Sequence, residues 1–214
     1  MTRPPLSRER VLDAAIRVAN RAGAEAITMR RVAQELGVEA MSLYHHVPNK
    51  DAILDGVVDT VFAAIDLPPT DRDDWREAIR ARAASAHRVL SQHTWALGLM
   101  DSRRHPGPAT LRHHDAVLGV LRTAGFSLPM AAHAISLIDS YVGGYVLQEA
   151  NLPVRTPGEV AEVATDILAT LPVEDLPYLT ELIVEHALRP GYDHTAEFAY
   201  GLDLILDALE LRRA

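Results

Sequence analysis

The chain has 214 residues, a formal net charge of −8 and a hydrophobic content of 48%. This composition predicts a soluble globular protein rather than a disordered one. Because the chain contains no cysteine, disulfides, a thiol nucleophile and cysteine-ligated zinc are excluded. No apolar run approaches the roughly 18 residues of a membrane helix, and MTRPPLSRER has no apolar stretch behind its charges. We therefore expect no signal peptide, no membrane partner and a cytoplasmic location.

The charge is spread unevenly along the chain. Residues 1–50 carry eight basic and five acidic side chains, a net charge of +3, which leaves −11 for residues 51–214. Such asymmetry indicates a nucleic-acid-binding end, with an acidic remainder that phosphates repel. An accidental surface gradient would give the same pattern, so charge alone does not decide the function.

Apolar residues recur at helical spacing in the N-terminal part, and turn-forming residues separate the runs. Ser7, Thr28 and Asn49 are predicted N-caps, while Gly23 and Gly37 are predicted helix ends. The four helices expected here span about 8–22, 29–36, 40–46 and 50–65.

Longer helices are expected beyond the LPPTD break at 67–71. They span about 73–91, 109–123, 127–149, 159–171, 176–188 and 194–212. No segment has the pattern of a strand, so the predicted fold class is all-α. We expect an N-terminal three-helix domain with a helix-turn-helix, in residues 1–66 with the connecting helix at about 50–65. A larger helical domain for ligand binding and dimerisation is expected in residues 67–214.

The segment Thr28–Lys50 has the pattern of a helix-turn-helix, with Gly37 at the bend. If the aliphatic residues pack inward, a short and mostly uncharged face of the second helix is left for the major groove. Arg30, Arg31 and Lys50 flank this face and are available for phosphate contacts. The residues expected to face outward are Ala40, Met41, Ser42, Tyr44 and His45.

The run from Ser7 to Phe62 resembles the N-terminal domain of the tetracycline-repressor (TetR) family. The resemblance rests on the alanine pattern that ends at Gly23-Ala24, on TMRRVAQELGV and on SLYHHVPNK. It implies that Ala40, Met41, Ser42, Tyr44 and His45 face DNA, and that Thr28, Arg30 and Lys50 support phosphate or base contacts. The alternative for Tyr44 and His46 is that they pack the domain, which we favour for His46.

The resemblance extends to Trp75 and to the GFSLPMAAHAIS run at 125–136, which look like the regulatory domain of the tetracycline-binding branch. It implies a homodimer in which helices at about 127–149 and 194–212 form a four-helix bundle. Broad apolar faces on both helices, and the symmetry needed to read two half-sites, favour the same arrangement. Gly143 and Gly144 lie within a helix, where each glycine lowers helix stability by about 1 kcal/mol relative to alanine. We interpret the pair as a place where another helix packs closely, rather than as space for a ligand.

The residues expected around a tetracycline–magnesium chelate are absent. GLMDSRRHPG occupies 98–107, Ser140 and Gln148 stand at the metal-binding histidine and acidic positions, and Arg82 and Ala86 replace a pocket Asn and Phe. We therefore expect a different small-molecule effector, and no cofactor or metal. In particular, His113 and His114 project about 100° apart on a helix and do not share a metal site.

Candidate pocket residues are those on helical faces between the regulatory helices. Each also has the alternative of ordinary packing or surface exposure. They are His87, Trp95, Met100, Arg104, His114, His133, Asp139, Tyr141, Tyr145 and Gln148.

The sequence thus predicts a ligand-responsive DNA-binding regulator, a repressor released from a palindromic operator by a small molecule. One alternative is a DNA-binding regulator without a ligand. Another is a helical enzyme, although no phosphate loop, nucleophile elbow or zinc helix motif is present.

Overall fold

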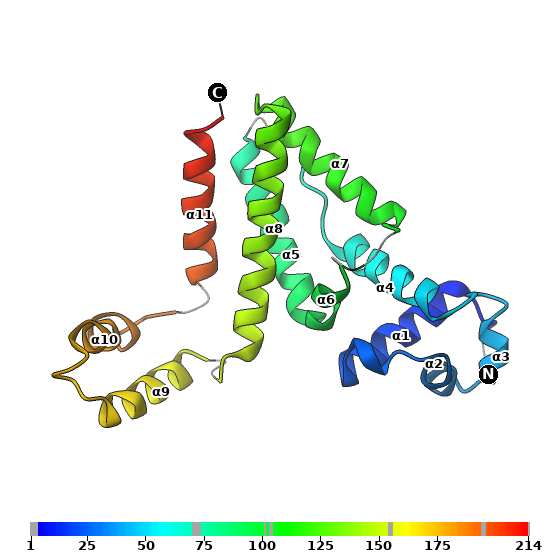
Figure 1. The fold of residues 1–214 in the computed structure, drawn as a ribbon, viewed down its shortest axis with the longest axis horizontal. Helices are drawn as coiled ribbons and strands as arrows, with labels where there is room; N and C mark the ends of the chain where they lie inside the picture. The colour runs from blue at the N-terminus through cyan, green and yellow to red at the C-terminus, as the bar shows by residue number, and fades with distance from the viewer. Residues whose placement is uncertain are drawn as a thin grey trace. The chain divides into compact units, whose positions relative to one another are not determined.

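The computed structural model describes residues 4–69, 74–100, 102, 105–153, 156–193 and 196–213. Every regular element in these ranges is a helix, which confirms the all-α prediction (Figure 1). None of the described helices is long and apolar enough to cross a bilayer. The helices are α1 (Arg8–Ala22), η1 (Ala24–Ala26), α2 (Met29–Leu36), α3 (Ala40–Leu43), α4 (Lys50–Ala64), α5 (Trp75–Gln92), η2 (Thr94–Ala96), α6 (Leu97–Met100), α7 (Pro108–Thr123), α8 (Leu128–Asn151), α9 (Pro157–Thr170), α10 (Pro177–Leu182), η3 (Ile183–Ala187) and α11 (Ala196–Glu210).

The predicted helix ends are confirmed where local chemistry sets them. Ser7, Thr28 and Asn49 each accept a hydrogen bond from the backbone N–H three residues ahead, at 3.3, 3.1 and 2.9 Å. Gly23 and Gly37 end their helices with φ angles of 77° and 63°, which glycine adopts without a Cβ clash.

Three elements differ from the prediction. Helix α3 ends at Leu43 rather than near 46, because residues 44–46 continue as turns: Tyr44 keeps α-region dihedrals, and the His46 N–H bonds the Leu43 carbonyl three residues back at 2.9 Å. The segment after α5, for which no helix is predicted, forms the short helices η2 and α6. The segment at 183–187 winds as a π-helix, which hydrophobic spacing does not distinguish from an α-helix.

The chain forms two compact units, one of residues 1–146 with 211–214 and the other of residues 147–210. Within the first unit, α1 packs against both α2 and α4, and α2 packs against α3. Their shared core includes the fully buried side chains of Val11, Ile27, Val32, Leu43 and Ile53. This core holds α3 at the surface with one face turned inward.

Helix α4 continues from that core to α5 and α7 of the same unit (Figure 1). Its last turns bury Val61 and Phe62, and it packs against α7. Asp59 accepts hydrogen bonds from the backbone N–H of Thr110 at 2.9 Å and from its hydroxyl at 3.2 Å. Because Gly107 has no side chain to cap α7, this carboxylate acts as the helix cap from another element.

A second core is built from α5, α7 and α8, and we call it the regulatory core after the domain that the sequence predicts here. Trp75 on α5 meets Phe126 edge to face, with ring centroids 4.9 Å apart. Arg82 and His113 are buried within this apolar core. Burial, assisted by the Arg82 guanidinium, lowers the pKa of His113, while the nearby Asp139 carboxylate and the backbone at residues 65 and 66 oppose that shift.

The second unit holds the end of α8, α9, α10, η3 and α11. A capping box begins α9, in which Thr156 and Glu159 each bond the other's backbone N–H. The η3 segment packs against both α9 and α10. His186 of η3 meets Tyr192 edge to face and lies 3.2 Å from the Glu197 carboxylate of α11.

The Asp59 cap makes a testable prediction about stability. Asp59→Ala should lower the free energy of unfolding by about 0.5–2 kcal/mol, as for other lost caps. A Cβ on residue 107 would lie 2.2 Å from the Asp59 carboxyl carbon, so Gly107→Ala should also destabilise the fold. The two losses should add only in part, because Asp59→Ala removes the carboxyl atoms at 2.2 and 2.4 Å from the new Cβ but keeps the Asp59 Cβ at 2.6 Å. Urea unfolding of both single variants and the double variant measures this coupling.

Gly119→Ala is the matched control for that cycle. A Cβ there meets nothing within 4 Å, so it should stabilise α7 slightly. Additive losses for Asp59→Ala and Gly107→Ala would contradict the capping role.

Acid should destabilise the fold through His113. The pKa of His113 lies below the value of about 6.5 in an unfolded chain. Between the two values only the unfolded chain binds the proton, so the free energy of unfolding falls as pH drops below about 6.5 and levels off below the folded pKa. Urea titrations at about pH 7.5 and about pH 5.5 should show a smaller loss for His113→Phe than for the wild type. The same loss in both proteins would contradict this prediction, and His114→Phe, at an exposed position, is the control.

Candidate functional site

The α2–α3 segment has helix-turn-helix geometry. Gly37 takes the left-handed conformation after α2, and the N–H of Val38 bonds the carbonyl of Ala33 at 3.0 Å. Val38 and Ala40 pack partly against the core. The turn therefore fixes the direction in which α3 leaves α2.

Helix α3 divides into a buried side and an exposed side. Leu43 is fully buried, whereas Met41 and Tyr44 are 73% and 48% exposed. Ser42 is half-buried and His45 is exposed. With Ala40, half-buried at the start of the helix, these residues form what we call the α3 surface: Ala40, Met41, Ser42, Tyr44 and His45.

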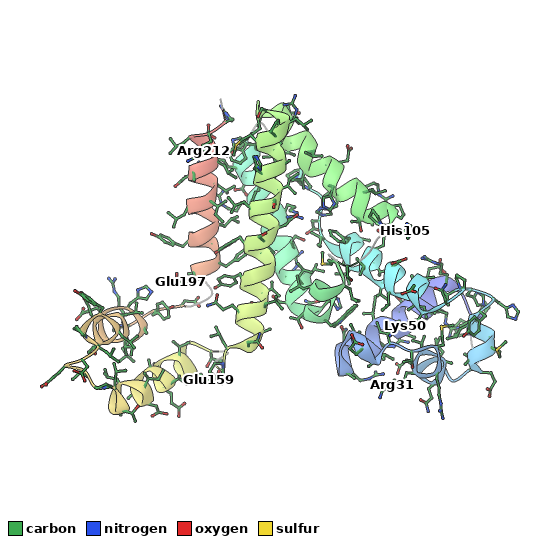
Figure 2. All side chains as sticks on the ribbon, viewed as in Figure 1. Arg31, Lys50, His105, Glu159, Glu197 and Arg212 are labelled. Atoms are coloured by element: carbon green, nitrogen blue, oxygen red, sulfur yellow. The ribbon has the colours of Figure 1, made fainter. Side chains whose placement is uncertain are left out.

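Cationic side chains lie on the helices beside this surface. Arg30 and Arg31 on α2 are exposed and form no ion pair with the described residues. Lys50, the only lysine of the chain, is the first residue of α4, and the Thr28 hydroxyl accepts the capping hydrogen bond of α2. Figure 2 labels Arg31 and Lys50, which come from these two helices.

Other N-terminal arginines are engaged within the fold. Arg17 and Arg21 on α1 both bind the Glu35 carboxylate of α2, the former at 2.9 Å. Their hydrogen bonds hold the pKa of Glu35 below its ordinary value. Two of the arginines of α1 are therefore paired with an acidic side chain, whereas Arg30, Arg31 and Lys50 on α2 and α4 form no ion pair with the described residues.

Four of the predicted pocket residues lie on two neighbouring helices of the regulatory core. The ring of His87 on α5 meets Tyr145 on α8 at 5.7 Å, and Tyr145 lies 6.0 Å from Tyr141. Asp139 on α8 binds the buried Arg82 of α5, with a nitrogen–oxygen distance of 2.5 Å. These four residues are His87, Asp139, Tyr141 and Tyr145.

The other predicted pocket residues lie elsewhere. Trp95 donates its indole N–H to Asn20 of α1 at 2.7 Å, and Met100 is half-buried at the end of α6. His114 and His133 are exposed. The remaining two are Gln148, which is exposed and belongs to the second compact unit, and Arg104, which lies outside the described residues.

The predicted pocket omitted two buried polar groups, Arg82 and His113. Arg82 lies three residues after Ile79 and four before Ala86, on the apolar stripe of α5. His113 lies four residues before Val117 on the buried side of α7, whereas His114 is exposed, with its ring at the edge of Phe62. Helical spacing therefore carried the signal that distinguishes the two histidines.

Within the described residues, no three acidic or histidine side chains gather closely enough to hold a metal ion. The described residues thus offer two candidate sites. One is the exposed α3 surface, whose side chains can form hydrogen bonds. The other is a polar cluster on α5, α7 and α8, formed by the buried Arg82 and His113 with Asp139.

Comparisons with known proteins agree with this arrangement. Residues 11–57 match the model for bacterial regulatory proteins of the tetR family, and residues 67–213 match that for the tetracyclin repressor-like C-terminal domain. The chain is 32% identical to the transcriptional repressor DrrR1 of Streptomyces coeruleorubidus, over 98% of this chain and 79% of that one. It is 31% identical to the class C tetracycline repressor of Escherichia coli, over 97% and 92%.

The solved structure of Streptomyces coelicolor ActR in complex with actinorhodin has a TM-score of 0.79 and 27% identity, covering 99% of this chain and all of that one. Taken together with the helix-turn-helix and the regulatory helices, these matches show that the chain belongs to the TetR family and is a DNA-binding transcription regulator rather than an enzyme.

Proposed function

We propose that the chain is a homodimeric repressor that binds a palindromic operator through the α3 surface and is released by a small organic molecule. The observation that carries this proposal is the division of α3, with Leu43 in the core and Met41 and Tyr44 exposed. A helix held in this way can lie in the major groove, which is about 12 Å wide, without disturbing its own packing. Since operator DNA lies in the bacterial cytoplasm, that is the proposed location.

The residues of this surface take two roles in the proposal. Ser42, Tyr44 and His45 can form hydrogen bonds with base edges, while Ala40 and Met41 offer apolar contacts such as those made to a thymine methyl group. Lys50, Arg30 and Thr28 supply phosphate contacts or support them, which position the protein without reading sequence.

Apolar residues exposed on α8 and α11 favour a homodimer through these helices. On α8, Leu137 and Leu147 are each 47% exposed, and a Cβ at Gly144 between them would meet nothing within 4 Å. On α11, Tyr200 and Leu204 are 66% and 54% exposed and lie one turn apart. Such unpartnered apolar surface is typical of interfaces, and the small residue permits close approach of a second helix.

The effector is proposed to be an organic molecule other than tetracycline–magnesium. The DrrR1 and class C relatives are named as repressors, and ActR was solved with actinorhodin, which supports repression and an organic effector. We place the reading head in residues 1–66 and the regulatory domain in 67–214. Helix α4 would couple the two domains, because its first turns pack in the core of α1, α2 and α3 and its last turns pack against α7. Typical coupling of about 1–3 kcal/mol would change operator affinity about 5–150-fold.

Selection of bound duplexes from a random DNA pool tests the proposal. The purified protein should enrich an inverted repeat whose half-sites are centred about one helical turn apart or a multiple of it. A control protein with Leu137→Glu and Leu204→Glu, aimed at the proposed interface, should fold but lose the repeat. If no sequence is enriched even at low salt, the proposed function is wrong.

Two substitutions should separate phosphate contact from base reading. Lys50→Ala should weaken all duplexes alike and reduce the salt dependence by about one charge. Tyr44→Phe removes a hydroxyl from the α3 surface and should instead change which bases are preferred. Binding to a panel of operator variants at several salt concentrations distinguishes them, with the exposed Arg88→Ala of α5 as the charge control. A base-specific effect of Lys50→Ala would overturn its assignment.

A further inference from the structure

A polar contact joins the end of α1 to the segment that follows α5. The indole N–H of Trp95 donates to Oδ1 of Asn20 at 2.7 Å, and Nδ1 of His93 lies 2.9 Å from the same oxygen. Asn20 belongs to α1, whereas His93 ends α5 and Trp95 lies in η2. One side-chain oxygen of the DNA-binding part is therefore held by two rings from the regulatory part of the same compact unit.

The chemistry of the three groups fixes the geometry of this contact. An indole nitrogen can only donate, so the atom that Asn20 presents is its carbonyl oxygen. Because that oxygen can only accept, Nδ1 of His93 carries a hydrogen and donates as well. Burial lowers the pKa of His93, so the ring is neutral at neutral pH. The two rings also meet edge to face, with centroids 6.0 Å apart.

Apolar packing surrounds the hydrogen bonds. Trp95 and Leu99 of α6 are half-buried and pack against the core that α1, α2 and α4 share. The η2 segment packs against α5, and α6 packs against α4 (Figure 1). The regulatory helices thus reach the DNA-binding helices by two routes, one through α4 and one through the end of α5.

The second route restricts how the DNA-binding helices can move. A body attached through one helix can still tilt about that helix, whereas a second attachment away from its axis opposes the tilt. Asn20 lies on α1, which packs against α2, and α2 packs against α3. In the proposed two-fold dimer, the distance between the two α3 surfaces depends on how each is held on its own regulatory helices.

We propose that Asn20, held by His93 and Trp95, is a positioning residue that sets the spacing of the two operator half-sites. This inference rests on the proposed function, because it concerns how the dimer selects among operators. One additional base pair moves a half-site by about 3.4 Å and turns it by about 35°. DNA-binding helices held at two places cannot follow that change unless one attachment breaks, whereas helices held by α4 alone can follow it.

Binding to the selected operator, and to versions with one base pair inserted or removed at its centre, tests the proposal. The wild type should bind the selected spacing about tenfold or more tightly than either altered spacing, within the usual range of such couplings. Asn20→Ala removes the acceptor and should reduce this ratio to about threefold or less. Asn20→Asp keeps an acceptor oxygen and should restore the wild-type ratio.

The matched control is Gln92→Ala, which removes an exposed amide one residue before His93. This variant should keep the wild-type ratio, and every variant should keep the same half-site sequence. A merely structural role of Asn20 would weaken binding to all spacings by the same factor and leave the ratio unchanged. That result, or an Asn20→Asp ratio as low as that of Asn20→Ala, would overturn the proposal.

A second measurement reports the same positioning without DNA. Because the chain has no cysteine, Glu39→Cys gives one spin-label site per protomer, at an exposed residue that forms no side-chain cap for α3. The distribution of distances between the two labels of the dimer should be narrow, should broaden with Asn20→Ala and should stay narrow with Gln92→Ala. An equally narrow distribution with Asn20→Ala would contradict the proposed restraint.

The two measurements distinguish failure of this inference from failure of the proposed function. If an inverted repeat is enriched but Asn20→Ala changes neither the spacing ratio nor the distance distribution, the inference is wrong and the proposed function stands. If no repeat is enriched while Asn20→Ala still broadens the distribution, Asn20 does position the DNA-binding helices, and the operator proposal falls.

Discussion

Helix α4 is shared by two cores, and the behaviour of the first compact unit depends on this sharing. Its first turns bury Ile53 and Leu54 among α1 and α2, and its last turns bury Val61 and Phe62 beside α7. Each such side chain contributes about 1.5–3 kcal/mol when buried. Detaching either end would cost more than the 1–3 kcal/mol or so of a typical allosteric coupling. Coupling of that size is therefore too small to detach either end of α4 from its core.

The contacts around α4 are of two kinds, and they respond differently to perturbation. The apolar contacts tolerate sliding, whereas the Asp59 cap on α7 is directional and has a fixed length. At the next turn, Phe62 meets the ring of His113, a buried polar group of the regulatory core. The polar cluster, the cap and the start of α3 are thus joined by packed side chains in one unit. This continuity gives the regulatory helices a physical route to the α3 surface.

Local chemistry made most of the fold predictable. Caps such as Thr28 and Asn49 and glycines such as Gly37 act within one turn, so sequence spacing locates them. The prediction was weaker where partners are distant in sequence. The engagement of Trp95 with Asn20 depends on how α1 meets the piece after α5, and no local pattern encodes it. The early end of α3 and the π-helical turn at 183–187 depend similarly on geometry beyond hydrophobic spacing. The burial of His113 rather than His114, by contrast, was present in the helical period of α7.

The chain uses arginine almost everywhere, keeps a single lysine at the start of α4 and has no cysteine. Amine-directed reagents can therefore react only at Lys50 and the N-terminus. Acetylation of Lys50 would remove one charge where α4 begins, without altering any other side chain. A cysteine introduced anywhere on the surface would likewise be the only thiol, so a probe attached there would report one position. The composition thus makes this regulator directly suited to site-specific chemical labelling.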